Sequence, residues 1–305
     1  MRTTLPAARF VQLVRRVAGV GLLACLSFGV LVALPGEAAP GSTATTTAPS
    51  CGSTVFRKPD GTRWRCTFAD YFSGTSLDTR KWTVMTSAAS GFGKRQDCFM
   101  SSKSNVLVTK GLLWLTSRRA APFTCGRGSR AFTARATSGM VSTMGKFAQD
   151  YGRFEFRASF PYTTQEGLQS SLWLWPQGAT GAMWPVTGEI DVAEWYSSWP
   201  DRVIPRLHYA TAFLLPRAAT NNRCLVPNVR AFHTYLLEWT PSSITISYDG
   251  RTCLRNTSWR TLGSAPFDKP YFLAMMQALG VGKNPPTSRT PMPASTMIDY
   301  VRIWS

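Results

Sequence analysis

The chain has 305 residues, with 34 lysines and arginines against 16 aspartates and glutamates, and a formal net charge of +18 at pH 7. So strong a positive charge attracts anionic partners. However, the basic residues are scattered and no helix-turn-helix, zinc-finger or RNP pattern accompanies them, which argues against a nucleic-acid-binding protein. An anionic cell wall, a sulfated polysaccharide or simple solubility accounts for the charge equally well.

The first 38 residues have the layout of a secretory signal peptide. Four arginines precede an apolar run from Val17 to Leu34, and small residues then lead to a predicted cleavage site near Ala38. Two alternatives remain open. The run is just long enough for a retained membrane anchor, and Leu22–Cys25 faintly resembles a bacterial lipoprotein box. Removal of residues 1–38, which hold four arginines and one glutamate, leaves a net charge of +15.

Residues 39–50 form a polar, low-complexity linker, so the folded body is predicted to span residues 51–305. That length suits one large β-sandwich or barrel, or two small domains. No second linker or internal repeat interrupts it, which favours a single domain.

The body contains six cysteines without the CxxC spacing of a zinc site, and this even number indicates export and up to three disulfides. Sequence proximity suggests the pairs Cys51–Cys66, Cys98–Cys125 and Cys224–Cys253. Six cysteines allow fifteen pairings, however, and buried free thiols are the alternative.

Alternating apolar and polar residues predict many short antiparallel strands. From Arg153 to Phe160, every second residue is apolar and shares one face. Ile244–Tyr248 leads through an Asp249–Gly250 turn into Arg251–Leu254. Further strands are predicted at Leu112–Thr116, Leu236–Trp239, Tyr271–Met275 and Met297–Trp304. With 24 glycines and 20 prolines for turns, the chain is expected to be all-β, a sandwich with a concave, aromatic-bearing face.

Three of the few acidic residues lie within six positions, at Glu189, Asp191 and Glu194. In a regular strand Glu189 and Asp191 share a face, whereas Glu194 points the other way. A one-residue β-bulge around Val192-Ala193 restores the register, and all three carboxylates then project into one cleft. The bulge is therefore a structural prediction on which the chemistry depends.

Two carboxyl groups roughly 5–5.5 Å apart are what a retaining glycosidase needs, one as nucleophile and one as acid and then base. The middle carboxylate also has a role, because closely spaced like charges cannot all ionise and one group keeps its proton near neutral pH. Calcium binding by the three acids, or a chance match, is the alternative. Calcium sites usually lie on loops rich in Gly, Asn and Asp, whereas these acids alternate with apolar residues.

The segment Gly188–Glu194, Gly-Glu-Ile-Asp-Val-Ala-Glu, resembles the active-site signature of glycoside hydrolase family 16 in its bulged, laminarinase-like form. Further segments that resemble the family follow one another in order over nearly the whole body, about residues 66–305. They are Phe68–Phe72 with Leu77, Asp78 and Trp82, then Ser138–Ser142, Tyr151–Glu155, Ser171–Pro176, Phe232–Thr240 and Ile298–Ile303.

This resemblance implies a concanavalin A-like β-jelly-roll sandwich with an open substrate cleft on its concave face. It also implies retaining endo-hydrolysis of β-1,3-glucan by double displacement, without a required cofactor. By motif position, Glu189 is the nucleophile, Glu194 the general acid/base and Asp191 the assisting carboxylate.

Trp173 and Trp184 match family tryptophans that line the cleft, where sugar rings stack on them. Alternation sets Trp173 opposite its two leucine neighbours. His208 matches a strand histidine beside the acid/base, with a core histidine satisfied by the backbone as the alternative. His233, in the Phe232–Thr240 segment, is interpreted as structural.

The chain departs from the family in one strand, where relatives often carry an asparagine and this chain has Met275–Gly280. Gln277 is predicted to supply the sugar hydrogen bond instead. Asp299 occupies the place of a closing-strand aspartate through which some related chains bind a structural calcium ion, so a calcium site is a further expectation.

The leading hypothesis is a secreted, monomeric endo-β-1,3-glucanase that binds polysaccharide but neither nucleic acid nor, once its signal is cleaved, a membrane; association with the cell envelope stays open. The same fold acting on mixed-linkage β-glucan or galactan, or as a transglycosylase, is the alternative. A non-catalytic glucan-binding module belongs to another class, and the presence of both glutamates argues against it.

Overall fold

The computed structural model describes residues 48–58, 60–90, 96–179, 183–259 and 265–305. The predicted signal peptide and most of the linker lie outside these residues, and only positions 48–50 of the linker are described, all of them exposed. Within the described ranges, no helix has both the length and the apolar character needed to cross a bilayer.

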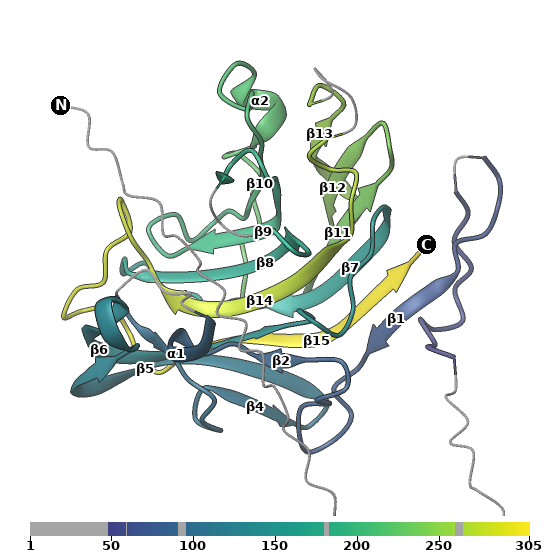
Figure 1. Cartoon of the computed structure of the whole chain (residues 1–305). Coiled ribbons are helices and arrows are strands. Elements are labelled where there is room, and N and C mark those ends of the chain that lie inside the picture. Colours follow the sequence, from purple (N-terminus) through teal and green to yellow (C-terminus); the bar gives the residue numbers. More distant parts are fainter. Residues whose placement is uncertain (1–47, 59, 91–95, 180–182, 260–264) are drawn as a thin grey trace, which may run out of the picture.

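The described chain is almost entirely β-structure (Figure 1). The short helices are α1 (Ser87–Ser90), the 3-10 helix η1 (Gly128–Arg130) and α2 (Pro216–Ala219). The strands are β1 (Cys66–Asp70), β2 (Thr83–Val84), β3 (Cys98–Phe99), β4 (Val106–Thr109), β5 (Leu112–Cys125), β6 (Phe132–Ser142), β7 (Gly152–Ser159), β8 (Leu168–Pro176), β9 (Glu189–Tyr196), β10 (Ile204–His208), β11 (His233–Trp239), β12 (Ile244–Tyr248), β13 (Arg251–Asn256), β14 (Tyr271–Leu279) and β15 (Ala294–Trp304).

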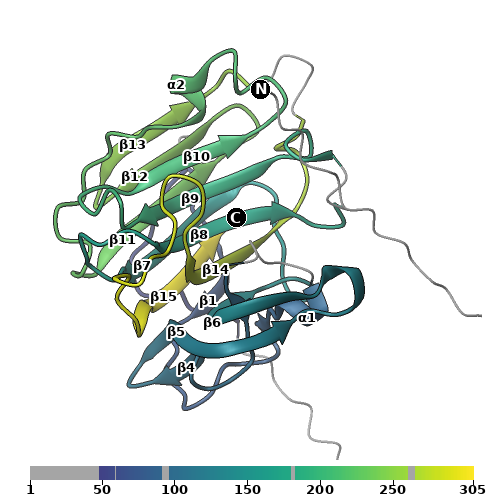
Figure 2. The same ribbon diagram turned by 90° about the vertical axis from the view of Figure 1, so that its left-hand side faces the viewer.

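The strands form two stacked, curved layers, which overlap in the view of Figure 2. One layer has the order β10-β9-β8-β14-β6, and the other has the order β5-β15-β7-β11-β12-β13. The layers join where β5 pairs with β6, and β1 adds to β15. The expected all-β sandwich is therefore confirmed.

The core lies between the layers, and strand alternation places its residues there. In β7, Phe154, Phe156 and Ala158 are completely buried, whereas Arg157 between them turns outward and pairs with Asp299. Burial of each of the two phenylalanine side chains contributes about 1.5–3 kcal/mol. The turn from β12 to β13 also follows the prediction, because Asp249 and Gly250 both have the positive φ that a type I′ hairpin requires.

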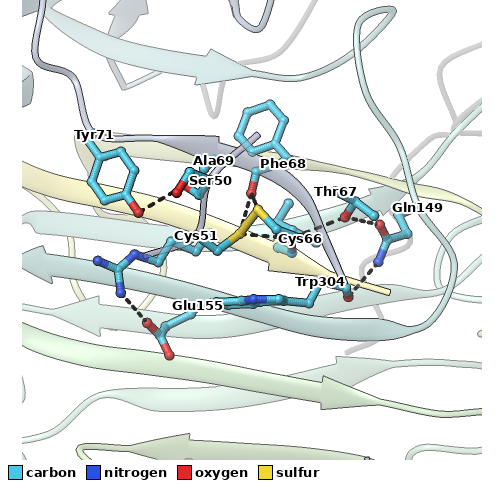
Figure 3. Close-up of a disulfide and its surroundings, with 12 residues drawn as sticks. Ser50, Cys51, Cys66, Thr67, Phe68, Ala69, Tyr71, Gln149, Glu155 and Trp304 are labelled. Carbon is cyan, nitrogen blue, oxygen red and sulfur yellow. Dashed lines mark hydrogen bonds and ion pairs between the residues drawn. A yellow bond between two sulfur atoms is a disulfide. The ribbon is translucent and has the colours of Figure 1, made fainter. Parts of the chain in front are cut away.

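The three cysteine pairs suggested by sequence proximity are confirmed. Cys51–Cys66, Cys98–Cys125 and Cys224–Cys253 are disulfides, with Cα–Cα distances of 5.7, 5.8 and 5.6 Å. Figure 3 shows the first of them beside Ala69 and Trp304, where it ties residue 51 to β1 and the closing strand (Figure 3). The start of the body is thus fastened to the layer that lies away from β9.

Candidate active site

Strand β9 contains the bulge that the sequence predicts. Leu172 and Trp173 are neighbours on β8, yet their partners on β9 are Ala193 and Asp191, so Val192 is the extra residue. The pairing with β10 is irregular over the same stretch. A bulge of this kind changes which face the following residues occupy.

Because of the bulge, the apolar residues of β9 all face the core and the acidic ones all face the cleft. The four core residues are completely buried: Ile190, Val192, Ala193 and Trp195. Glu189, Asp191 and Glu194 line a cleft of about 210 Å³ on the other face, together with Trp173 and Met276. The three carboxylates therefore lie side by side, as the mechanism predicted from the sequence requires.

Gly188 explains how the chain enters this strand. Its φ of +86° is one that side-chain-bearing residues rarely adopt, and a Cβ atom there would lie 2.1 Å from the Tyr271 hydroxyl oxygen. That hydroxyl donates hydrogen bonds to the carbonyl oxygens of Thr187 and Pro266. Only glycine fits this turn, which delivers Glu189 directly to the first position of β9.

Glu189 has one oxygen held by Trp184 at the cleft rim. The indole Nε1 donates to Glu189 Oε2 at 2.7 Å, while about half of the Trp184 side chain stays exposed. Burial, and secondly the negative charge of Asp191, raise the pKa of Glu189 to about 8. The cluster thus resists carrying a full negative charge on each carboxylate.

His208 lies inside the site and not in the core. Its Nε2 is 3.2 Å from Asp191 Oδ2, and its ring packs against Trp184 with centroids 4.9 Å apart. Burial lowers the pKa of His208, so the imidazole is neutral at pH 7. One oxygen or nitrogen atom from each of Glu189, Asp191 and His208 lies within 4.8 Å of the other two. Among the described residues, this is the only group of three side chains close enough together to share a metal ion.

Glu194 is held by two residues that the sequence interpretation missed. Tyr196 Oη donates to Glu194 Oε1 at 2.6 Å, and Gln169 Nε2 donates to the same oxygen at 3.2 Å. Arg206 Nε lies 4.0 Å from the other oxygen. The signal was present, since Tyr196 follows Glu194 by two positions and shares its face, and Gln169 is the cross-strand partner of Tyr196.

The two substrate-contact predictions on β8 and β14 have different outcomes. Trp173 faces the cleft, while its leucine neighbours are completely buried on the core side. The prediction for Gln277 is wrong, because this residue faces the core and is completely buried. Its Oε1 accepts hydrogen bonds from the Ser170 and Thr296 hydroxyls, both at 2.8 Å.

The cleft wall at β14 is formed instead by the neighbours of Gln277. Met276 and Ala278 line the cleft, so the strand register differs by one residue from the predicted one. Asp97 contributes a fourth carboxylate to the cleft wall, and its Oδ2 accepts a hydrogen bond from the Leu279 N–H at 2.9 Å. His233 is structural as interpreted: its ring nitrogens lie 2.6 Å from Asp249 Oδ2 and 2.7 Å from the Asn228 carbonyl oxygen.

The surroundings of Asp299 do not fit the predicted calcium site. Its carboxylate pairs with the guanidinium of Arg157, whose neighbour on the other side is the ring of Phe232. The arginine already supplies the positive charge that a calcium ion would bring, and calcium needs six to eight oxygen ligands.

Comparisons with known proteins agree with this geometry. The family model described as glycosyl hydrolases family 16 matches residues 92–301. Glucan endo-1,3-beta-glucosidase A1 of Niallia circulans is 30% identical over 264 residues, which cover 77% of this chain and 37% of that protein. The beta-glucanase of Rhodothermus marinus is 29% identical over 265 residues, which cover 81% of this chain and 87% of that protein.

A solved structure shows the same fold. The endo-beta-1,3-glucanase from Pyrococcus furiosus superposes with a TM-score of 0.70 at 24% identity, covering 82% of this chain and 97% of that one. The chain spans little more than a third of the first of the two sequence relatives, but most of the second.

Proposed function

The chain belongs to glycosyl hydrolase family 16, and from that premise we propose that it is a secreted, retaining endo-β-1,3-glucanase. The observation that carries the proposal is the bulge at Val192, which brings Glu189, Asp191 and Glu194 to one face inside a cleft. The names of the two relatives support a glucan substrate. Trp173 in the cleft and Trp184 at its rim offer apolar ring surfaces to a sugar.

In the first half of the reaction, the Glu194 carboxyl donates its proton to the glycosidic oxygen, and that carbon–oxygen bond breaks. Glu189 Oε attacks the anomeric carbon from the opposite side and forms a covalent glycosyl-enzyme. In the second half, Glu194, now a carboxylate, removes a proton from water as the water attacks the same carbon. The sugar leaves with its original anomeric configuration, and both glutamates return to their starting states.

The protonation state of Asp191 affects whether Glu189 is ionised during this cycle. The negative charge of Asp191 raises the pKa of Glu189, so a proton on Asp191 favours the ionised, nucleophilic form of Glu189. His208, whose Nε2 lies 3.2 Å from Asp191 Oδ2, is neutral and therefore places a polar group beside this carboxylate without adding charge. Tyr196 and Gln169 hold Glu194 in place while its own protonation changes.

We also propose that the protein is exported and acts as a monomer. The leader at residues 1–38 supports export, as do three disulfides, since these bonds persist in oxidising compartments. The net charge of +15 without the leader also suits contact with an anionic cell envelope.

The test is incubation of the mature protein, residues 39–305, with laminarin, followed by measurement of new reducing ends. We expect oligosaccharide products whose anomeric configuration, followed by NMR, is retained. Glu189→Gln should abolish this activity, whereas Glu166→Gln, at a partly exposed glutamate outside the cleft, should leave it unchanged. An inverted product would overturn the assignment of the two glutamates.

A panel of substrates separates the alternatives. Faster cleavage of mixed-linkage glucan or galactan than of laminarin would move the substrate assignment and leave the mechanism intact. Longer oligosaccharides appearing in place of new reducing ends would identify a transglycosylase. Binding to laminarin without any cleavage would identify a glucan-binding module.

A further inference from the structure

The carbonyl group of the bulged residue is bonded to a side chain from the opposite layer. Tyr248, at the end of β12, crosses the core and donates a hydrogen bond from its hydroxyl to the Val192 carbonyl oxygen at 2.8 Å. Both residues are buried, with Val192 completely inaccessible and Tyr248 2% exposed. The contact thus connects the non-catalytic layer directly to the irregular point of the catalytic strand.

This bond satisfies a need that the bulge creates. Val192 has no cross-strand partner in the register of β9 with β8 or with β10. The residue of β10 that stands opposite the bulge, between Ile204 and Arg206, is Pro205, which has no N–H to donate. A buried carbonyl group needs a donor. Burial raises the pKa of Tyr248 well above its usual range, so its hydroxyl stays protonated and remains a donor.

We propose that Tyr248 is a positioning residue for the reaction, because its hydroxyl fixes the bulge at Val192 and thereby the placement of Glu194 relative to Glu189. The inference rests on the proposed function and adds a residue outside the cleft to it. Glu189 precedes the bulge and Glu194 follows it, so any relaxation between them changes the separation of the two carboxyl groups. Retaining cleavage depends on that separation.

A neighbouring tyrosine provides a matched control. Tyr235 on β11 is the direct cross-strand partner of Tyr248, and the two rings lie 5.0 Å apart. Tyr235 is also completely buried, but its hydroxyl has no hydrogen-bond partner among the described residues. Tyr235→Phe therefore removes a buried hydroxyl from the same aromatic cluster without touching the bulge.

The experiment compares wild type, Tyr248→Phe and Tyr235→Phe on laminarin, well below the melting temperature of each protein. For Tyr248→Phe we expect kcat to fall by roughly 10- to 100-fold, because misplacement by about 1 Å has costs of that size. KM should stay within about twofold, since the residue does not line the cleft. Tyr235→Phe should keep both constants within about twofold of wild type.

Amide hydrogen exchange gives a second readout that does not depend on activity. In Tyr248→Phe, the amides of Val192, Ala193 and Glu194 should exchange faster than in wild type and in Tyr235→Phe. Equal kcat values and equal exchange in the two variants would overturn the inference, whereas the proposed function would stand. If wild type cleaves no glucan or galactan, the proposed function fails, and the exchange comparison still decides whether Tyr248 holds the bulge.

Discussion

Replacing Glu189 with glutamine should make the protein more stable as it removes the activity. The pKa of Glu189 is raised from 4.5 to about 8 by burial and by Asp191, so the folded protein disfavours the ionised form. At 1.36 kcal/mol for each pKa unit, the ceiling of this cost is about 5 kcal/mol. Because the side chain is only partly buried, solvent screens the charge, and we expect a gain of about 2 kcal/mol near pH 8.

The sign of the effect depends on pH in a defined way. At about pH 4 the carboxyl group is protonated in both the folded and the unfolded protein, so Glu189→Gln should change stability little. The pKa of Glu189 is 4.5 in the unfolded chain and about 8 in the folded protein. Between these two pH values the carboxyl group is ionised in the unfolded chain but still protonated in the folded protein, so wild type progressively loses stability relative to the variant. Above that range the difference should level off.

Urea denaturation of both proteins, at several pH values from about 4 to about 9, measures this difference. A glutamine side-chain oxygen can still accept the hydrogen bond from Trp184, so the local geometry is preserved. Glu166→Gln, at a partly exposed glutamate outside the cleft, is the control and should show no such pH dependence. A stability difference that is constant with pH, or a wild type that gains on the variant as pH rises, would refute the reasoning.

Three further predictions follow from the same contacts. Asp191→Asn removes a charge that raises the pKa of Glu189, so the acidic limb of the plot of kcat/KM against pH should move to lower pH. The same change should lower kcat about 100-fold. A movement of the acidic limb to higher pH would contradict this prediction. Gln277→Ala should lower the free energy of unfolding by about 1–3 kcal/mol and leave KM unchanged, because the partners of Gln277 are hydroxyl groups in the core. A raised KM would instead support the sugar contact that was predicted from the sequence. Chelation with EDTA should leave Tm unchanged, because Arg157 already pairs with Asp299, whereas a lower Tm would reveal a calcium site.

The sequence predicts the parts of the structure in which one face of a strand is polar. Alternation identified β7 and the β12–β13 hairpin, and the bulge followed from the spacing of acidic and apolar residues in β9 alone. Strand β14 is different, because all nine of its residues are buried. One face packs in the core and the other forms the cleft wall, so no alternation of polarity marks its register, and the role of Gln277 was assigned to the wrong face.

The residues that hold the catalytic groups were harder to predict because their partners lie far apart in the chain. Gln169 reaches Glu194 from β8, and Tyr248 reaches the bulge from 56 positions away through the core. Gln169 can be found only once the pairing of β8 with β9 is known, and Tyr248 leaves no local pattern, since a tyrosine at the end of a strand resembles an ordinary core residue. A bulge can be predicted from one strand, but the donor that satisfies it depends on how the two layers stack. The catalytic strand can therefore be predicted from the seven residues Gly188–Glu194, whereas the geometry that makes it effective is a property of the whole sandwich.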